Sequence, residues 1–317
     1  MTTDFFNLDP ESILTATELA GFHPTGVFTQ LNSYENRVFD IRLEAQDSLI
    51  AKFYRPQRWS LDAIMEEHQF LAELNSEEIP CLQPLTLQNN KTLLDYQGIY
   101  VAYFPKFRGR MPQELSSSDL KRIGQLLARV HNVGAKYEAT NRPYMDSTYY
   151  GGWETLDRLH DLITPELRTR YLEAAEAILE FIDAEFDADD FIRIHGDCHK
   201  GNILQHQDIF YLVDFDDFVN GPPVQDLWML LSFDDKTLEQ EKDLITEGYE
   251  MFREFPYYQW NWVEALRGLR ILMYAGWIAK RWNQDPSFPK IFPQFGSYGY
   301  WAEETEALEK IAWNLGN

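Results

Sequence analysis

Three polar residues follow two short apolar runs in the middle of the chain. Asp197 and Asn202 come after the run 191–194, and Asp214 comes directly after the run 209–213. Apolar runs of this length predict short strands, and we expect the polar residues beyond them to meet in one cleft. Two carboxylates and an amide oxygen could orient an attacking hydroxyl and hold a magnesium ion, as phosphoryl transfer requires.

The spacing of these residues predicts a separate role for each. An Asp with an Asn five residues later, and a further Asp after the next strand, is the spacing of a kinase catalytic loop and its metal-binding Asp. We therefore predict that Asp197 is the catalytic base and that Asp214 is the second catalytic residue. Asn202 and Asp214 would together hold magnesium.

The residue identities within these motifs are more specific than their spacing. Residues 195–202 read His-Gly-Asp-Cys-His-Lys-Gly-Asn, and residues 214–217 read Asp-Phe-Asp-Asp. Together they resemble the signature of the aminoglycoside-phosphotransferase branch of protein-kinase-like enzymes. The likeness runs nearly from end to end, through the segments 31–38, 52–56, 66–70, 221–222 and 224–231. The resemblance implies a kinase, a transferase that uses ATP and magnesium to phosphorylate a hydroxyl group.

The same resemblance implies a bilobal, protein-kinase-like α+β fold. Residues 1–102 would form a nucleotide-clamping N-lobe with an antiparallel sheet and one key helix. Residues 103–317 would form a larger, mostly helical C-lobe with the catalytic loop, the metal site and the substrate-binding helices. The local sequence agrees with this organisation. The expected strands are 27–31, 38–43, 49–54, 92–95 and 99–104, and the expected helices begin near Glu11, Ser60, Ser118 and Pro165.

Lys52 lies within an apolar strand run, where a lysine is usually solvent-facing. Its predicted partner changes this interpretation. Glu67 falls on the apolar stripe of the next helix, three residues after Ile64 and four before Leu71. A carboxylate on a buried helix face needs a cation, because an unpaired buried charge is costly. We therefore predict a Lys52–Glu67 pair that positions the α- and β-phosphates of ATP, as in kinases.

The segment 32–36 lies where kinases fold a glycine-rich loop over ATP, yet it contains no glycine. Chemistry alone leaves two possibilities open, a phosphate-binding loop or a simple hairpin turn. The family resemblance favours the first and places Ser33 nearest the phosphates of ATP. A P-loop mechanism is not expected, because the chain lacks Gly-x4-Gly-Lys-Ser/Thr. Adenine would contact backbone groups of 101–104, beside a hinge at Phe104-Pro105.

Further polar residues near the motifs have structural interpretations. His195 and His199 flank Asp197 in a way that superficially resembles a transition-metal site. The spacing does not suit zinc, however, and the loop needs Asp197 to be free. Asp226 resembles the structural aspartate that holds the catalytic loop from a helix below. Asp216 could support either the metal or the fold, and the sequence does not decide between them.

The composition limits the classes of partner. The chain has 28 basic and 51 acidic residues, a net charge of −23, which argues against nucleic acid and anionic membranes. This charge would suit a cationic substrate, although solubility alone also explains it. The longest apolar run, 271–279, is too short to span a membrane and is expected to be a buried helix. Two cysteines and the N-terminal sequence are typical of a cytoplasmic protein, which we expect to be monomeric.

The acceptor of the phosphoryl group is open to more than one interpretation. Within the family, the likeness is to bacterial stress-response kinases, which implies a serine/threonine protein kinase that also phosphorylates itself. The short segment between Asp214 and Asp226 leaves no room for a long activation loop. This feature favours a small-molecule acceptor of the aminoglycoside, choline or homoserine type. We favour protein acceptors, because the likeness extends nearly from end to end.

Two further alternatives concern the rest of the chain. The aromatic residues of 238–317 could line a cleft for a cationic small molecule, or they could simply fill the core. The protein could also be a nucleotide-binding module without catalysis. A decayed site would normally have lost one of the polar residues described above, and the sequence retains all of them.

Overall fold

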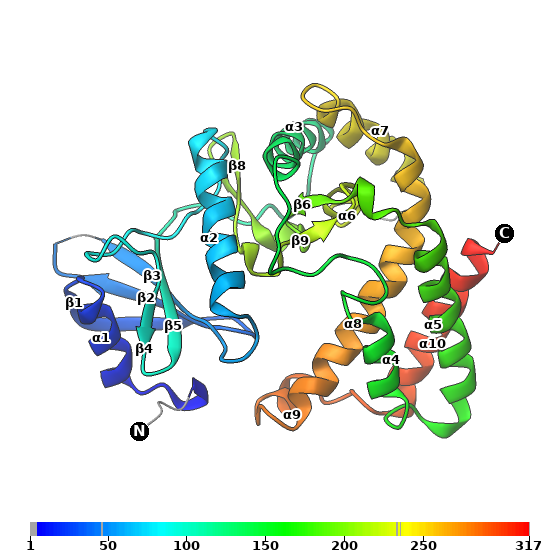
Figure 1. Cartoon of the computed structure of the whole chain (residues 1–317), viewed down its shortest axis with the longest axis horizontal. Coiled ribbons are helices and arrows are strands. Elements are labelled where there is room, and N and C mark those ends of the chain that lie inside the picture. The colour runs from blue at the N-terminus through cyan, green and yellow to red at the C-terminus, as the bar shows by residue number, and fades with distance from the viewer. Residues whose placement is uncertain (1–4, 46, 233, 235, 317) are drawn as a thin grey trace.

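A computed structural model describes residues 5–45, 47–232, 234 and 236–316. The chain forms two lobes, a smaller one around an antiparallel sheet and a larger one that is mostly helical (Figure 1). The boundary predicted between residues 102 and 103 falls within β5 (Ile99–Pro105), which is the last strand of this sheet along the chain. Among the described residues, no helix has the length and apolar character that crossing a membrane would require.

The smaller lobe contains five strands in the order β1-β2-β3-β5-β4, each antiparallel to its neighbours. The tight turn between β4 and β5 has positive φ angles at Gln97 (54°) and Gly98 (89°). The five strands predicted for residues 27–104 all lie in this sheet. Their observed bounds are β1 Pro24–Leu31, β2 Arg37–Leu43, β3 Ser48–Phe53, β4 Leu94–Tyr96 and β5 Ile99–Pro105.

Two helices accompany the sheet, α1 (Pro10–Leu19) and α2 (Leu61–Ser76), after a short 3-10 turn, η1 (Phe5–Asn7). Ser60 caps α2 as predicted, because its side chain accepts a hydrogen bond from Ala63 N at 3.1 Å. The apolar face of α2, with Phe70 and Leu71, belongs to the hydrophobic core of the larger lobe. The helix α2 therefore stands between the sheet and the larger lobe (Figure 1).

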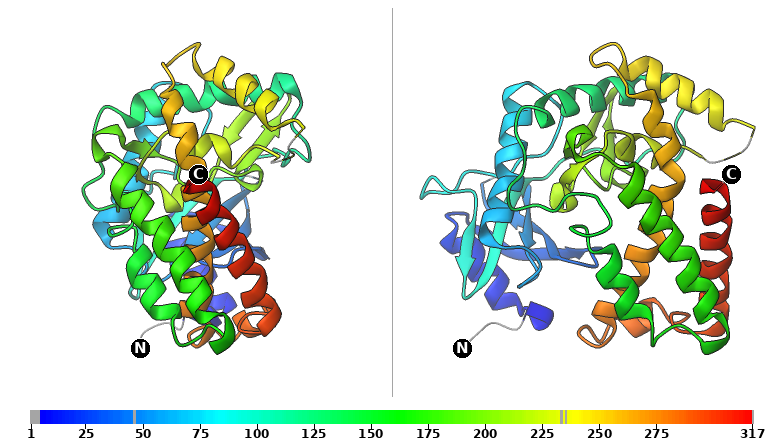
Figure 2. Two further views of the ribbon diagram at one scale, coloured as in Figure 1. Left: turned by 90° about the vertical axis from the view of Figure 1, so that its right-hand side faces the viewer. Right: turned by 45° about the vertical axis from the view of Figure 1, so that its right-hand side comes forward.

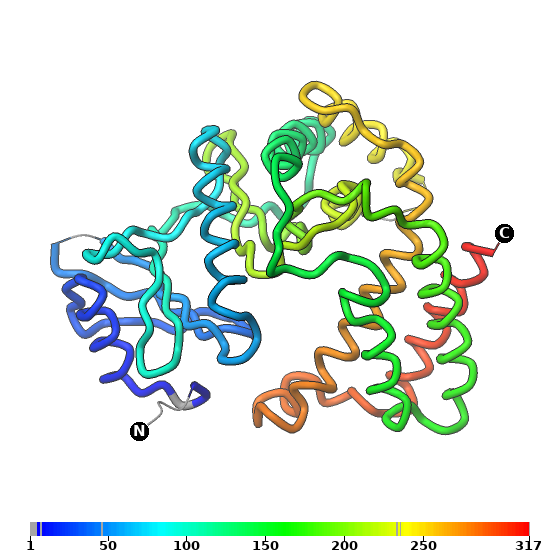
Figure 3. The backbone as a smooth tube through the Cα atoms, in the orientation of Figure 1, coloured from blue at the N-terminus to red at the C-terminus, as the bar shows by residue number. Residues whose placement is uncertain are grey.

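The larger lobe contains the remaining helices, several of which lie side by side (Figure 2). The connection from α3 to α4 passes close to α2 (Figure 3). At this point Arg142 donates two hydrogen bonds to Ala63 O, at 3.0 and 2.8 Å. The helices are α3 Ser117–Gly134, α4 Gly152–Leu159, α5 Pro165–Glu185, α6 Val224–Trp228, α7 Leu238–Tyr249, α8 Val263–Trp282, α9 Phe288–Ile291 and α10 Tyr298–Leu315.

Two small sheets carry the predicted catalytic segments. In one sheet β6 (Ile192–Ile194) pairs with β9 (Val219–Gly221), and in the other β7 (Ile203–His206) pairs with β8 (Ile209–Leu212). The two apolar runs of the sequence are thus strands β6 and β8, in separate sheets. Short 3-10 segments complete the lobe: η2 Ala188–Asp190, η3 Lys200–Asn202, η4 Phe215–Asp217 and η5 Tyr257–Trp262.

The helix α3 begins at Ser117, close to the start expected near Ser118, but the interpretation of Ser118 as its cap was wrong. Ser116, and not Ser118, caps α3, since its side chain accepts from Asp119 N at 3.2 Å. Asp119 in turn accepts from Ser116 N at 3.0 Å and completes a capping box. Three consecutive serines offer similar caps, and the position of Asp119 three residues after Ser116 selects the first of them.

Candidate active site

The loop that follows β6 is held from below by Asp226 of α6. The fully buried carboxylate of Asp226 accepts hydrogen bonds from His195 N (2.8 Å) and Gly196 N (2.9 Å). It also contacts His131 Nε2 at 3.1 Å. Gly196 has φ +81°, and a Cβ at this position would lie 2.4 Å from the carbonyl oxygen of Asp217. Asp226 is therefore structural, as the sequence indicated, and only glycine fits at position 196.

Asp197 lies at the centre of this loop, and both of its carboxylate oxygens have partners. Oδ1 accepts a hydrogen bond from Arg270 Nη1 at 2.8 Å. Oδ2 lies 3.3 Å from Asn202 Nδ2 and 3.4 Å from His199 Nε2. Burial would raise the pKa of Asp197, but the hydrogen bond from His199 and the charge of Arg270 outweigh it and lower the pKa to about 2. The carboxylate is therefore ionised at neutral pH.

Asp214 lies beside this loop, at the start of η4. Val213 N donates to Asn202 O at 3.0 Å, and His195 Nε2 contacts Val213 O at 2.9 Å. Asp214 has left-handed backbone angles, φ 61° and ψ 66°, and its side chain is 57% exposed. The chain thus brings one predicted metal ligand next to the loop that carries the other.

The donor set of these two residues fits a magnesium ion. Asn202 uses its amide nitrogen toward Asp197, at 2.9 Å from the backbone oxygen, so its Oδ1 remains available as a ligand. One oxygen of Asp214 lies 3.3 Å from Lys52 Nζ, and the other can face a metal. Magnesium usually takes only one or two carboxylates beside water and phosphate oxygens. The described residues contain no group of three or more His, Cys, Asp or Glu side chains that could hold a metal ion by themselves.

Lys52 is buried and lies among three carboxylates. Its Nζ is 2.9 Å from Asp216 Oδ1, 3.3 Å from Asp214 Oδ1 and 3.4 Å from Glu67 Oε1. Burial would lower the pKa of Lys52, but the charges of Asp216 and Glu67 raise it well above its usual range. The predicted contact with Glu67 is present, and the shortest contact is with Asp216, which the sequence did not identify as a partner.

Asp216 connects segments of both lobes. Its buried carboxylate pairs with Arg58 and Lys52, and it accepts a hydrogen bond from Asn36 Nδ2 at 3.1 Å. Its backbone oxygen accepts from Arg142 Nη1 at 2.6 Å. Burial alone would raise the pKa of Asp216, yet Arg58 and Lys52 hold it well below the usual range. These contacts give Asp216 a role in the fold, one of the two roles that the sequence left open.

The loop between β1 and β2 contains Ser33, which is half-buried. Two residues later, the carboxylate of Glu35 contacts Arg281 Nε at 2.8 Å, Arg55 Nε at 2.9 Å and Trp277 Nε1 at 2.6 Å. Trp277 and Arg281 belong to α8 of the larger lobe. The loop is therefore attached to both lobes, a feature that the sequence analysis missed.

The predicted site residues form two groups. One contains Lys52, Glu67 and Asp214, and the other contains Asp197 and Asn202, joined through the contacts of Val213. Ser33 lies outside these two groups, in the β1–β2 loop. Arg270 was also missed, because it lies in α8, far along the chain from the motifs.

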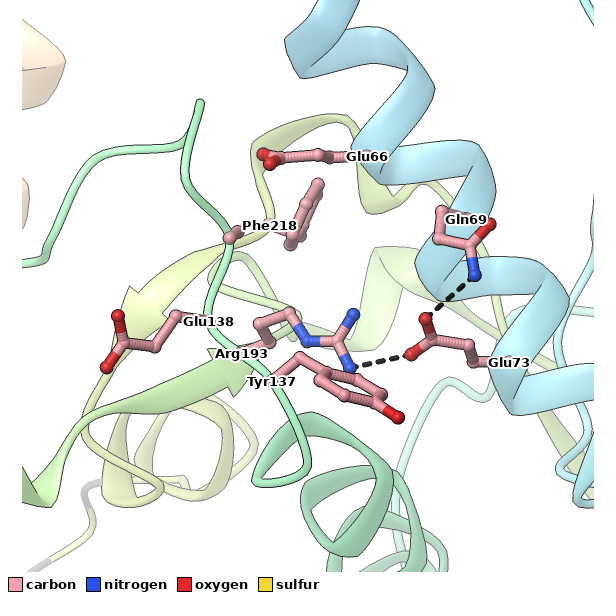
Figure 4. A pocket seen from close by; sticks show the side chains of 8 residues that line it. Glu66, Gln69, Glu73, Tyr137, Glu138, Arg193 and Phe218 are labelled. Carbon is pink, nitrogen blue, oxygen red and sulfur yellow. Dashed lines mark hydrogen bonds and ion pairs between the residues drawn. The ribbon is translucent and has the colours of Figure 1, made fainter.

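A separate cavity of about 160 Å³ lies between α2 and the larger lobe (Figure 4). It contains none of the predicted site residues. Within it, Arg193 Nη2 donates to Glu73 Oε2 at 2.6 Å, and this ion pair links β6 to α2. The residues that line the cavity are Glu66, Gln69, Glu73, Tyr137, Glu138, Ala139, Arg193 and Phe218.

Comparison with known proteins identifies relatives over most of the chain. Residues 27–263 match the phosphotransferase enzyme family, APH. Stress response kinase A of Escherichia coli strain K12 is 38% identical over 303 residues, which cover 95% of this chain and 92% of the relative. Serine/threonine protein kinase RdoA of Salmonella typhimurium strain LT2 is 39% identical over 305 residues, with the same coverage of both chains.

Solved structures share the fold at lower identity. Amicoumacin kinase hAmiN, in complex with AMP-PNP, Ca²⁺ and Ami, superposes with a TM-score of 0.76 at 18% identity, covering 96% of this chain and 93% of that one. Spectinomycin phosphotransferase APH(9)-Ia, in complex with ADP and spectinomycin, gives a TM-score of 0.65 at 13% identity and covers 96% and 98%. The predicted bilobal, protein-kinase-like α+β fold is confirmed.

Proposed function

The chain belongs to the phosphotransferase enzyme family, and on this premise we propose that it is an ATP- and magnesium-dependent serine/threonine protein kinase of bacterial stress response. One observation carries the catalytic part of this proposal. An ionised, partly buried carboxylate, Asp197, lies in the loop that presents Asn202, next to the segment that presents Asp214. This is the arrangement that phosphoryl transfer to a hydroxyl requires.

Each residue of the site takes one role in the proposed reaction. Asp197 accepts the proton of the acceptor hydroxyl, whose oxygen forms a bond to the γ-phosphorus as the bond to the bridging oxygen of ADP breaks. Asn202 Oδ1 and Asp214 hold the magnesium ion, which neutralises charge on the phosphate oxygens when it is bound. Lys52 contacts the α- and β-phosphates and Glu67 orients Lys52, while Ser33 lies nearest the phosphates in the β1–β2 loop.

The choice of a protein acceptor rests on the relatives. The proteins named Stress response kinase A and serine/threonine protein kinase RdoA are 38–39% identical to this chain over 95% of its length. The structures named amicoumacin kinase and spectinomycin phosphotransferase are only 13–18% identical and support the fold alone. A small-molecule acceptor remains the second candidate, because the segment from η4 to α6 is too short for a long activation loop.

Incubation of the purified protein with γ-labelled ATP and magnesium tests the proposal. The protein is assayed alone, with a generic basic protein and with a panel of small molecules, and Asp197→Asn serves as the blank. Label on serine or threonine of a protein, absent from the blank, is the expected result. Label confined to a small molecule would make the second candidate correct. Binding of ATP without any turnover would instead indicate a nucleotide-binding module.

A further inference from the structure

One side of α8 forms a continuous stripe between the two ends of the candidate site. The stripe consists of Arg270, Tyr274, Trp277 and Arg281, at spacings of four, three and four residues. Arg270 contacts Asp197 at one end, while Trp277 and Arg281 bind Glu35 of the β1–β2 loop at the other. This side of α8 therefore runs from Asp197, the proposed catalytic base, to the β1–β2 loop.

The stripe contacts only one of the two carboxylate oxygens of Asp197. Oδ2 faces Asn202 and His199, on the side of the proposed metal ligands. Oδ1 faces α8 and accepts from Arg270 Nη1 at 2.8 Å. An acceptor hydroxyl that reaches Oδ1 therefore arrives beside the guanidinium group of Arg270.

Arg270 has capacity for a further partner. Its side chain is 44% exposed, and its contacts within the described residues are Asp197 and, at 3.9 Å, the sulfur of Met229. Arg281, at the other end of the stripe, is by contrast 7% exposed and binds Glu35 with two nitrogens. A guanidinium group carries five N–H donors in a planar fork that suits a carboxylate or phosphate.

We propose that Arg270 is a specificity-determining residue that selects acceptors with an anionic group next to the hydroxyl that is phosphorylated. This inference rests on the proposed function and specifies its substrate class as serine or threonine with a neighbouring acidic residue. Tyr274, one turn after Arg270 on the same side of α8, is 47% exposed and could contact the adjoining peptide. The net charge of −23 would suit a cationic substrate, whereas the guanidinium group of Arg270 beside Asp197 repels one.

Isomeric peptides test this proposal with the full-length protein. Each peptide contains one serine and the same residues, and an aspartate lies directly before the serine, directly after it, or at the far end. A fourth peptide carries lysines next to the serine. The expected result is a kcat/KM about tenfold higher for one of the adjacent isomers, the size of one charge-assisted contact. Equal use of all isomers by the unaltered protein would overturn the proposal.

Substitutions assign the effect to Arg270. Arg270→Met is expected to abolish the preference, and Arg270→Glu to reverse it in favour of the peptide with lysines. Arg267→Met, one turn away on α8, is the matched control and should keep the preference. Thermal unfolding establishes that each variant is folded. If Arg270→Met lowers kcat equally for every peptide and for hydrolysis of ATP, Arg270 acts on the transferred phosphoryl group and the proposal is wrong.

Two small acceptors separate this inference from the proposed function. The panel includes an anionic hydroxy acid and a cationic aminoglycoside. If only the hydroxy acid is labelled, and Arg270→Met abolishes that labelling, the protein acceptor is wrong while the selection by Arg270 stands. If the aminoglycoside is labelled in preference to the peptides, or if nothing is labelled, both are wrong.

Discussion

Glu35 and Arg281 form a two-point ion pair that joins the two lobes. Arg281 Nε lies 2.8 Å from Glu35 Oε1, and Arg281 Nη2 lies 2.9 Å from Oε2. Arg55 adds a second cation to the same carboxylate at 2.9 Å. The β1–β2 loop lacks glycine, and its position is fixed by these ion pairs with α8 and with the chain after β3.

Glu35→Gln should release the β1–β2 loop from α8. The neutral amide removes the carboxylate that pairs with the buried guanidinium group of Arg281, a loss on the order of 3 kcal/mol for a buried pair, while Arg55 keeps Asp285 as a partner at 3.4 Å. We expect faster hydrogen exchange in 32–36 and a Kd for ATP that rises at least tenfold. Glu44→Gln, at an exposed position beyond β2, is the control and should change neither quantity. Unchanged exchange in the loop of Glu35→Gln would contradict this role.

Gly196→Ala should disable the catalytic loop. The residue has φ +81°, and its new Cβ would lie 2.4 Å from the carbonyl oxygen of Asp217, so the loop must shift. We expect transfer activity to fall at least a hundredfold, because misplacement of a reacting group by about 1 Å can cost that much. Gly98→Ala is the matched control, since it has φ +89° but nothing within 4 Å of its Cβ. Comparable losses of activity in both variants would refute the steric explanation.

Asp226→Asn should destabilise the protein by about 2 kcal/mol, the usual range for hydrogen bonds to a charged group. The carboxylate now accepts hydrogen bonds from the backbone N–H groups of His195 and Gly196. In the variant, the amide nitrogen, itself a donor, would face one of these two N–H groups. Urea unfolding measures the loss, and the exposed Asp157→Asn is the control. Equal stability of the two variants would mean that Asp226 does not hold the loop.

Glu304 should make stability fall as pH rises. Burial raises the pKa of this carboxyl from 4.5 to about 7, although hydrogen bonds from Tyr300 and Tyr171 oppose the shift. Because the folded pKa is the higher one, the folded state favours the protonated carboxyl. The stabilisation is therefore complete below about pH 4.5 and is lost as pH rises through 7.

Unfolding in urea between pH 5 and 8 measures this effect. Wild type should lose up to about 3 kcal/mol relative to Glu304→Gln, because each tenfold difference in proton affinity between the folded and unfolded states corresponds to about 1.4 kcal/mol. Glu303→Gln, its exposed neighbour, should follow the wild-type profile. Parallel profiles of wild type and Glu304→Gln would show that Glu304 does not titrate in this range.

Much of the candidate site could be predicted from the sequence, because its residues occur at short fixed spacings or on periodic elements. Asp197 and Asn202 share one loop, and Glu67 lies on the apolar stripe of α2, where its need for a cation identified Lys52. The strands of the larger sheet were also predicted. The short strands β7 and β9 were missed, because their sequences, Ile-Leu-Gln-His and Val-Asn-Gly, lack the mainly apolar run that identified β6 and β8.

The remaining features could not be predicted, because they depend on contacts between segments far apart in the chain. Arg270 reaches Asp197 across 73 residues, and Arg281 reaches Glu35 across 246. Neither arginine belongs to a motif, and both lie on a helix whose pattern predicts only burial. Asp216 is similar, since its partner Arg58 lies 158 residues away.

The role of Asp197 is the central claim, and single-turnover transfer from γ-labelled ATP tests it most directly. Wild type and Asp197→Asn are compared with the same peptide acceptor, and nucleotide affinity and thermal unfolding are measured for both. We predict that Asp197→Asn binds magnesium–ATP with unchanged affinity and remains folded, while its rate of transfer falls by about a hundredfold or more, as expected for the loss of a general base. An unchanged rate of transfer in the folded variant would contradict the account.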